Sequence, residues 1–182
     1  RVLPNGALDS TFGFNGVSLF SANDVQYAAS LELGPNGTIL VGGSTNEPIP
    51  LAGVASFVWN VVRFTANGVR DTSFGHEGVL QIALPQSTVA VLSDLAVGPT
   101  GEIVAVGTNR TDAATVNLAI AKITAAGTLD PSFGAGGVSQ AQLGINGAFL
   151  NETIPNHVLL QSDGKIVIGG QLRVTLQVGQ DL

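Results

Sequence analysis

The stretch that decides the fold is residues 63–79, RFTANGVRDTSFGHEGV, because the chain carries it three times. The other two copies are residues 1–17, RVLPNGALDSTFGFNGV, and residues 122–138, KITAAGTLDPSFGAGGV. All three share a cation, an apolar residue and then the pattern Gly-x-x-Asp-x-Ser/Thr-Phe-Gly-x-x-Gly-Val. The aspartates of successive copies are 62 and 59 residues apart, a period typical of repeat architectures.

A second motif recurs in the same order. It reads GPNGTILVGG at residues 34–43, GPTGEIVAVG at 98–107 and QSDGKIVIGG at 161–170. In each copy a turn residue followed by Gly stands between two apolar runs, which is a strong short-range signal for a β-hairpin. The run after the turn is rich in β-branched residues and predicts a strand buried on both faces. The Gly pair that closes the first and third copies indicates a bend or a close approach of two backbones.

Further strands are predicted beside each hairpin. One covers residues 56–64 and, in the next copy, 117–123. Another follows the last Gly of the first motif, at residues 17–20, 79–82 and 138–141. No long segment shows the 3.6-residue period of a helix, so the sequence predicts an all-β protein.

The predicted fold is three four-stranded antiparallel blades of a β-propeller. The blades form one repeat domain or fragment over residues 1–182, with copies at 1–62, 63–121 and 122–182. A closed ring has about four to eight blades. Three are too few, so we expect that a longer natural chain, or association of several chains, completes the ring. A β-trefoil, which also has three four-stranded repeats, is the alternative fold.

Composition excludes several classes of protein. The chain is 45% hydrophobic and only 11% charged, which is too apolar for a disordered chain. It has a net charge of −6 and no cluster of its seven Lys and Arg residues, so we expect no nucleic-acid partner. Its apolar runs are shorter than the roughly 18 residues of a membrane span. The absence of Cys excludes disulfides, thiolate metal sites and Cys nucleophiles.

The paired motifs resemble the bacterial delta-60 repeats, a β-propeller-like family of large exported proteins. The resemblance covers residues 1–182, but copy two departs from it at residues 100–102 and 105–107, where one Gly of the pair is lost. It implies a propeller located outside the cell or in the cell envelope. The cysteine-free, lysine-poor, acidic composition fits the same location. The resemblance implies no activity and brings no catalytic residues.

The repeated aspartates are the most visible polar feature. Asp9, Asp71 and Asp130 are interpreted as caps of their own turns, accepting backbone N–H groups two or three residues ahead. The phenylalanine three residues later in each copy is then a core residue. Calcium or sugar ligation, one aspartate per blade, is the alternative interpretation, and the sequence leaves any calcium dependence open. The equivalent cations Arg1, Arg63 and Lys122 are expected to pair with these aspartates.

One segment brings hydrolase residue types together: Asp71, Ser73, His76 and Glu77. Ser73 belongs to the repeated motif and so has a structural explanation, whereas His76 does not repeat and is expected to be a surface loop residue. His157 has no second His nearby, so no zinc site is predicted. We therefore predict no catalytic residues, no metal site and no cofactor, and leave the ligand-binding residues unknown.

Glycosylation sequons occur at Asn36, Asn109 and Asn151, as expected by chance in a chain rich in Asn and Thr. The large aromatics Trp59 and Tyr27 are predicted to pack in the core.

Segments that do not repeat are the better candidates for specificity. Residues 45–56, 108–115 and 144–156 differ in length and composition among the copies. Variable loops on a regular scaffold are where binding specificity normally lies. We predict a non-enzymatic module that acts as scaffold, adhesin or assembly subunit and binds a protein or glycan, or further repeats of the same protein, through these loops. A propeller lectin or hydrolase with its site at the axial opening is the alternative.

Overall fold

The computed structural model describes residues 1–19, 25–48, 55–111, 115–145, 148–149 and 152–173. Within these ranges the regular structure is β, apart from the 3-10 turn η1 (Pro35–Gly37). The strands are β1 (Val25–Leu33), β2 (Ile39–Pro48), β3 (Ala55–Phe64), β4 (Val79–Ile82), β5 (Val89–Val97), β6 (Ile103–Arg110), β7 (Val116–Ile123), β8 (Val138–Ala141), β9 (Gly144–Ile145), β10 (Ala148–Phe149), β11 (Glu152–Leu160) and β12 (Ile166–Arg173). No helix of the described residues is long and apolar enough to cross a membrane.

Antiparallel pairing between neighbours in the sequence builds the sheets. Strands β1, β2, β3 and β4 pair in chain order as one four-stranded sheet, and β5, β6, β7 and β8 pair in the same way. Strand β11 pairs with β12, and one parallel bridge, Glu152 to Val116, joins β11 to β7. The prediction of an all-β protein is confirmed. No sheet closes on itself within the described residues.

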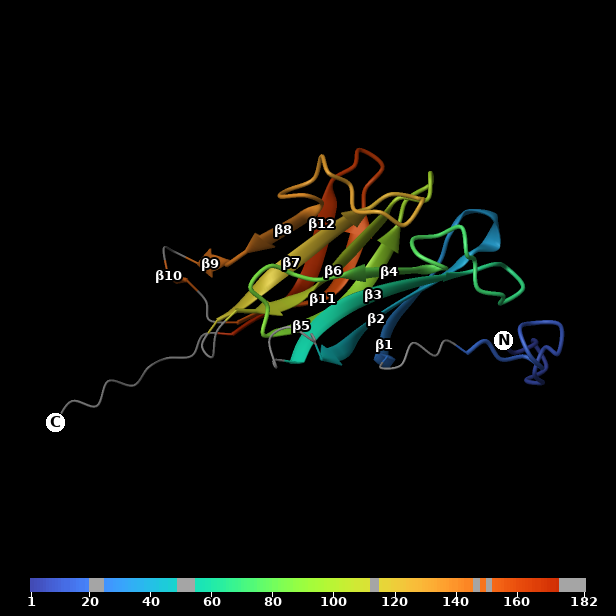
Figure 1. Ribbon diagram of the computed structural model, residues 1–182. Helices are drawn as coiled ribbons and strands as arrows, with labels where there is room; N and C mark the ends of the chain where they lie inside the picture. The colour runs from blue at the N-terminus through green and yellow to red at the C-terminus, as the bar shows by residue number, and fades with distance from the viewer. Residues whose placement is uncertain (20–24, 49–54, 112–114, 146–147, 150–151, 174–182) are drawn as a thin grey trace.

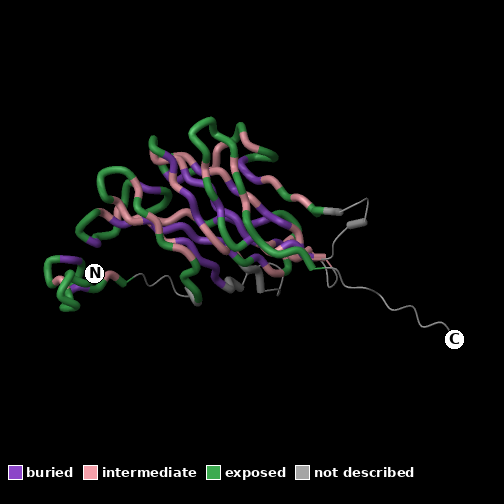
Figure 2. Tube along the Cα trace, turned by 180° about the vertical axis from the view of Figure 1, so that it is seen from behind, coloured by how far each residue is buried: buried purple, intermediate pink, exposed green. Residues whose placement is uncertain are grey.

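The sheets stack face to face, with the core between them (Figure 1). One cluster of buried residues joins the first two sheets and includes Leu40, Trp59 and Leu95. A second, smaller cluster joins the second sheet to β11 and β12 and includes Val104 and Val158. Figure 2 shows buried residues concentrated in the middle of the stack, while the turns are exposed. Burying both faces of the middle sheet in this way explains the unbroken apolar run of β6.

Most predicted strands form close to their predicted bounds. The strand at residues 17–20 is an exception: Val17 makes only an isolated bridge to Phe14, and Phe20 lies outside the described residues. Strand β4, the equivalent strand of the next copy, pairs with residues 59–62 of β3. Residues 17–19 pair with no strand among the residues that the structure describes.

The two large aromatics differ in burial. Trp59 is fully buried, as predicted, but the prediction for Tyr27 is wrong because its side chain is 73% exposed. Tyr27 lies on β1, which is an edge strand of its sheet.

Close backbone approach explains the Gly at the end of the second motif. A Cβ added at Gly43, Gly107 or Gly170 would overlap the carbonyl oxygen of Tyr27, Val91 or Ile154 on the neighbouring strand. The neighbouring strand has a register shift close to each of these sites. The predicted close approach is confirmed at Gly43 and Gly170, and Gly107 shows that copy two keeps the Gly that the geometry needs.

We expect Gly107→Ala to lower the free energy of unfolding by about 1–3 kcal/mol, the usual cost of overpacking, because its methyl group has no room beside Val91 and Trp59. Gly169→Ala is the matched control, since a Cβ at Gly169 meets nothing within 4 Å. Thermal unfolding of both variants measures the difference. Equal melting temperatures would contradict the account of this Gly.

Candidate functional site

Asp71 caps the turn that follows it. Its Oδ1 accepts the N–H of Ser73 at 3.1 Å and the Ser73 hydroxyl at 2.6 Å, and its backbone carbonyl accepts the N–H of Phe74 at 3.1 Å. The same side-chain bonds form in the pairs Asp9–Thr11 and Asp130–Ser132. The capping prediction is confirmed in all three copies.

Arg63 joins this turn to the next copy. Its Nε donates to Asp71 Oδ2 at 2.8 Å, and its Nη2 donates to Ser73 Oγ at 3.1 Å. Its Nη1 donates to the carbonyl oxygen of Ala125, which lies 62 residues further along the chain, at 2.6 Å. The guanidinium carbon is 4.7 Å from the centroid of the Phe74 ring, within range of a cation–π interaction. One side chain thus binds its own aspartate, its own aromatic ring and the next turn.

Phe74 and Gly75 complete the contact between the copies. Phe74 is fully buried and lies against Gly127, where an added Cβ would come within 2.8 Å of a ring carbon. The N–H of Gly75 donates to the carbonyl oxygen of Ala126 at 2.9 Å. Gly127 therefore provides both a turn with positive φ and a flat surface for the ring.

The same contact forms between copies one and two. Arg1 donates to the carbonyl oxygen of Ala66 at 3.0 Å and Gly13 donates to that of Asn67 at 2.8 Å, while a Cβ at Gly68 would lie 2.7 Å from the Phe12 ring. We call this set of bonds the inter-repeat contact. The predicted ion pairs are confirmed at N–O distances of 2.8 Å, 2.8 Å and 3.3 Å for Arg1–Asp9, Arg63–Asp71 and Lys122–Asp130. Sequence reasoning missed the acceptor turn.

The electrostatics of the inter-repeat contact favour the ionised aspartate. The Ser73 hydroxyl is the strongest influence that lowers the pKa of Asp71, and the Arg63 charge lowers it further against an opposing effect of burial. The pKa values of Asp9 and Asp130 are lowered first by the hydroxyls of Thr11 and Ser132. These carboxylates are therefore charged partners of the fold and poor general bases at neutral pH.

Polar side chains also lie close together on the strands that precede the second motif in the three copies. Ser30 of β1, Asp94 of β5 and His157 of β11 occupy the same position in each copy, next to a register shift. Ser30 Oγ donates to Asp94 Oδ1 at 2.8 Å, and His157 Nδ1 lies 3.7 Å from Asp94 Oδ2. We call these three residues the polar column. Sequence reasoning did not find this proximity, because residues 63 positions apart meet here.

The polar column binds backbone groups of the following copy. The N–H of Leu95 donates to Ser30 Oγ at 3.2 Å, and the N–H of Val158 donates to Asp94 Oδ2 at 3.0 Å. In both cases a side chain of the preceding copy accepts the hydrogen bond of a backbone N–H that lies next to a β-bulge. Burial, followed by the negative charge of Asp94, raises the pKa of nearby Glu32.

Hydrolase residue types meet in the polar column, but in the wrong order for a triad. In a triad the histidine lies between the nucleophile and the carboxylate. Here the carboxylate of Asp94 lies between Ser30 and His157. The arrangement can hydrogen-bond a polar ligand, since the His157 side chain is 85% exposed.

The hydrolase residue types of the first motif have separate roles. Ser73 is held by Asp71 and Arg63, while His76 is exposed in the turn, as predicted. Among the sequons, the fully buried Asn109 donates to the Pro85 carbonyl and to Gln140, and Asn151 lies outside the described residues. No group of three or more His, Asp or Glu residues that could hold a metal ion occurs in the described part of the chain.

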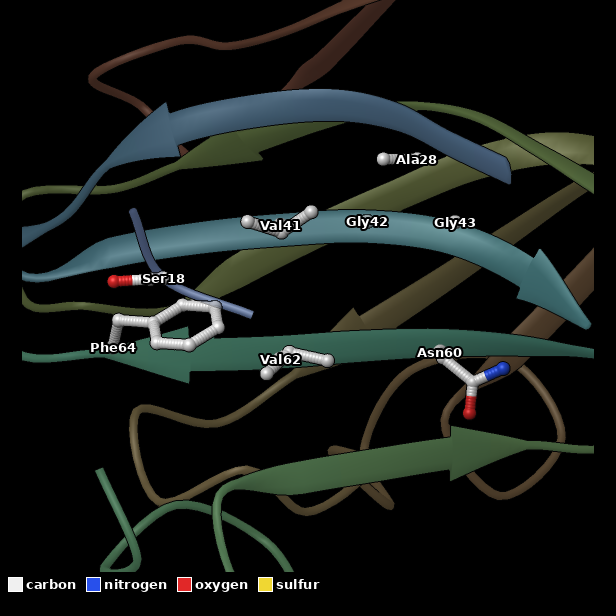
Figure 3. A pocket seen from close by; sticks show the side chains of 8 residues that line it. All are labelled: Ser18, Ala28, Val41, Gly42, Gly43, Asn60, Val62 and Phe64. Carbon is white, nitrogen blue, oxygen red and sulfur yellow. The ribbon is translucent and has the colours of Figure 1, made fainter. Parts of the chain in front are cut away.

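A hollow of about 220 Å³ opens on the outer face of the first sheet (Figure 3). Its lining is mostly apolar and includes Val41, Val62 and Phe64, with Ser18 of the N-terminal segment beside them. The buried Asn60 donates to Thr45 Oγ1 at 2.9 Å, while its Oδ1 has no partner among the described residues. Sequence reasoning did not predict this hollow.

The three variable segments lie partly outside the described residues. Their described parts include the ends of β2 and β6, the start of β3, strands β9 and β10, and the start of β11. The bridge between Glu152 and Val116 places the segment 144–156 beside the residue that follows the segment 108–115. Figure 1 shows the end of β2 and the start of β3 on the same side of the stack.

Comparison with known proteins supports a propeller-like fold. Residues 34–74 and 98–133 match a family model described as "Domain of unknown function (DUF5122) beta-propeller". Both matched segments run from the hairpin turn of the second motif to the phenylalanine of the first motif. No curated protein matches the chain. The chain is therefore similar to a β-propeller-like repeat family.

We expect the free energy of unfolding of Asp71→Asn to depend less on pH in the acid range than that of the wild type. The folded-state pKa of Asp71 lies below its ordinary value of about 3.9, so the ionised group adds stability above that pH and loses it as pH falls through the folded pKa. Urea unfolding, followed by fluorescence of the single Trp, measures this from neutral to acid pH.

The difference in unfolding free energy between wild type and Asp71→Asn should shrink at low pH. Asp163→Asn is the control, because the Lys165–Asp163 pair is largely exposed and such pairs contribute little. A difference that stays constant with pH would show that the charge of Asp71 does not matter.

Proposed function

We propose that the chain is a module of three four-stranded β-propeller blades that serves as a non-enzymatic scaffold, adhesin or assembly subunit. It binds a protein or glycan through the variable segments, outside the cell or in the bacterial envelope. The family similarity supports the propeller, and the resemblance to delta-60 repeats supports the location.

The inter-repeat contact is the observation that carries this proposal. The polar side chains of the first motif bind one another and the backbone of the next copy: Arg63, Asp71 and Ser73. A group held in this way is not available to a ligand. Specificity then belongs to segments that differ among copies, residues 45–56, 108–115 and 144–156.

The polar column favours a second candidate function. In a propeller the first strand of each blade faces the central opening, so Ser30, Asp94 and His157 would lie there together. Such a site fits a lectin or a hydrolase that recognises polar groups. The two candidates differ in which residues a ligand needs.

We expect the chain to bind a subset of spots on a glycan array and to release no product from glycoside or ester substrates. Replacing residues 49–54 and 112–114 with Gly-Ser segments of equal length should abolish binding and leave the melting temperature unchanged. His157→Ala, at an exposed side chain, is the matched control and should bind as wild type does.

The opposite pattern would overturn the proposal in favour of the second candidate. In that case His157→Ala loses binding or turnover, and the loop replacements have no effect. An array without bound spots would contradict a glycan as the ligand.

A further inference from the structure

The chain contains two packing interfaces between sheets that can be compared position by position. In the first interface, between copies one and two, β5 packs against β1, β2 and β3. In the second interface, between copies two and three, β11 packs in the same way against β5, β6 and β7. A side chain that differs between equivalent positions therefore shows directly what one interface has and the other lacks.

An indole ring fills the first interface. Trp59 is fully buried, and a Cβ added at Gly107 would lie 2.6 Å from its ring carbon Cζ2. Ile82 pairs with Trp59 in the register of β3 and β4 and is itself only 1% exposed. The ring and its aliphatic neighbour are both members of the buried cluster that joins the first two sheets.

Smaller side chains occupy the same positions of the second interface. Leu118 pairs with Ala141 in the register of β7 and β8, as Trp59 pairs with Ile82 in β3 and β4. Gly170 of β12 is the equivalent of Gly107. The three atoms nearest to a Cβ at Gly170 belong to the neighbouring strand β11, and none belongs to Leu118. The second interface therefore has the glycine without the ring that lies against it in the first.

A hollow of about 170 Å³ lies at this place. We call it the second-interface hollow. Its lining is mostly apolar and comes from copies two and three, including Leu118, Leu143, Thr153, Pro155, Ile168 and Leu172. The difference from the first interface lies in the side chains of these two copies and not in either end of the chain.

Thr153 gives the second-interface hollow a buried hydroxyl. Its side chain is 4% exposed, and its Oγ1 has no hydrogen-bond partner among the described residues. Ala90 occupies the equivalent position of the first interface, four residues before Asp94, so the repeat does not need a hydroxyl there. In the first interface the unpaired buried group is instead the Nε1 of Trp59. An unpaired buried polar group costs free energy, and a bound partner recovers it.

The size and lining of the second-interface hollow suit an aromatic ring better than water. A buried water typically makes about three hydrogen bonds, whereas this hollow offers one unpaired buried side-chain oxygen. An apolar cavity of about 150 Å³ engineered into another protein stays dry and binds benzene. Burial of a ring therefore supplies the affinity, and the hydroxyl supplies the orientation.

We propose that the second-interface hollow binds a small aromatic heterocycle with one ring N–H, of which indole is the simplest representative. The ring takes the place that Trp59 fills in the first interface, and its N–H donates to Thr153 Oγ1. Leu143 and Leu172, which are 38% and 43% exposed, form the rim through which the ring enters. This site does not rest on the proposed function.

Isothermal titration calorimetry of the 182-residue chain with indole tests the site. We expect one molecule to bind per chain. Leu118→Trp should abolish binding, because its own ring then fills the hollow as Trp59 fills the first interface. Leu159→Trp is the matched control, since Leu159 is 67% exposed, and it should bind indole as wild type does. A cooperative melting transition shows that each variant is folded.

Indene, which has the shape of indole but no N–H, separates the hydroxyl from the hollow. Wild type should bind indole about fivefold more tightly than indene, the typical effect of one hydrogen bond. Thr153→Val keeps the volume of the side chain and should bind the two compounds equally. Thr72→Val makes the same change at an exposed residue and should retain the preference for indole.

Several outcomes would overturn the proposal. They are a wild type that binds no indole up to its solubility limit, a wild type that binds indole and indene equally, and a folded Leu118→Trp that still binds indole. If Leu118→Trp does not fold, Thr153→Val decides, and a preference for indole that persists in this variant would overturn the proposal. Failure on any of these counts leaves the glycan array as a separate test of the proposed function.

Discussion

The contact of Arg63, Asp71 and Phe74 with the turn at residues 125–127 is the interaction on which the rest of the structure depends. Each sheet exposes two apolar faces and cannot bury them alone. The inter-repeat contact sets the position of one sheet on the next, because it combines an ion pair, a seated ring and a backbone hydrogen bond at one corner. The residues of the first motif follow from these requirements.

The features that the sequence predicts correctly are those that depend on residues close together in the sequence. The caps at Asp9, Asp71 and Asp130 involve partners two residues away, and the hairpin turns depend on adjacent residues. Strands β4 and β8 begin and end as predicted because each follows a fixed turn. Residues 17–19 show the limit: the same local signal gives no strand there, where no described strand lies beside them.

Contacts between copies could not be predicted, because no residue type marks them. In the sequence, Gly127 predicts only a turn. Its contact with the Phe74 ring is seen only when two copies lie side by side. The polar column combines three unlike residues, Ser30, Asp94 and His157, at one repeated position. The positions that repeat in sequence form the scaffold that the copies share. The polar column and the variable segments lie at positions that differ between the copies.

A double-mutant cycle between Phe74 and Gly127 tests the central claim, that the first motif holds each copy to the next. Phe74→Ala removes the ring, and Gly127→Asn fills the surface beneath it while keeping a residue that tolerates positive φ. The unfolding free energies of wild type, both single variants and the double variant give the coupling. The inter-repeat contact predicts a coupling energy of about 0.5–3 kcal/mol, with Gly127→Asn less harmful once the ring is absent. Additive effects of the two substitutions would contradict it.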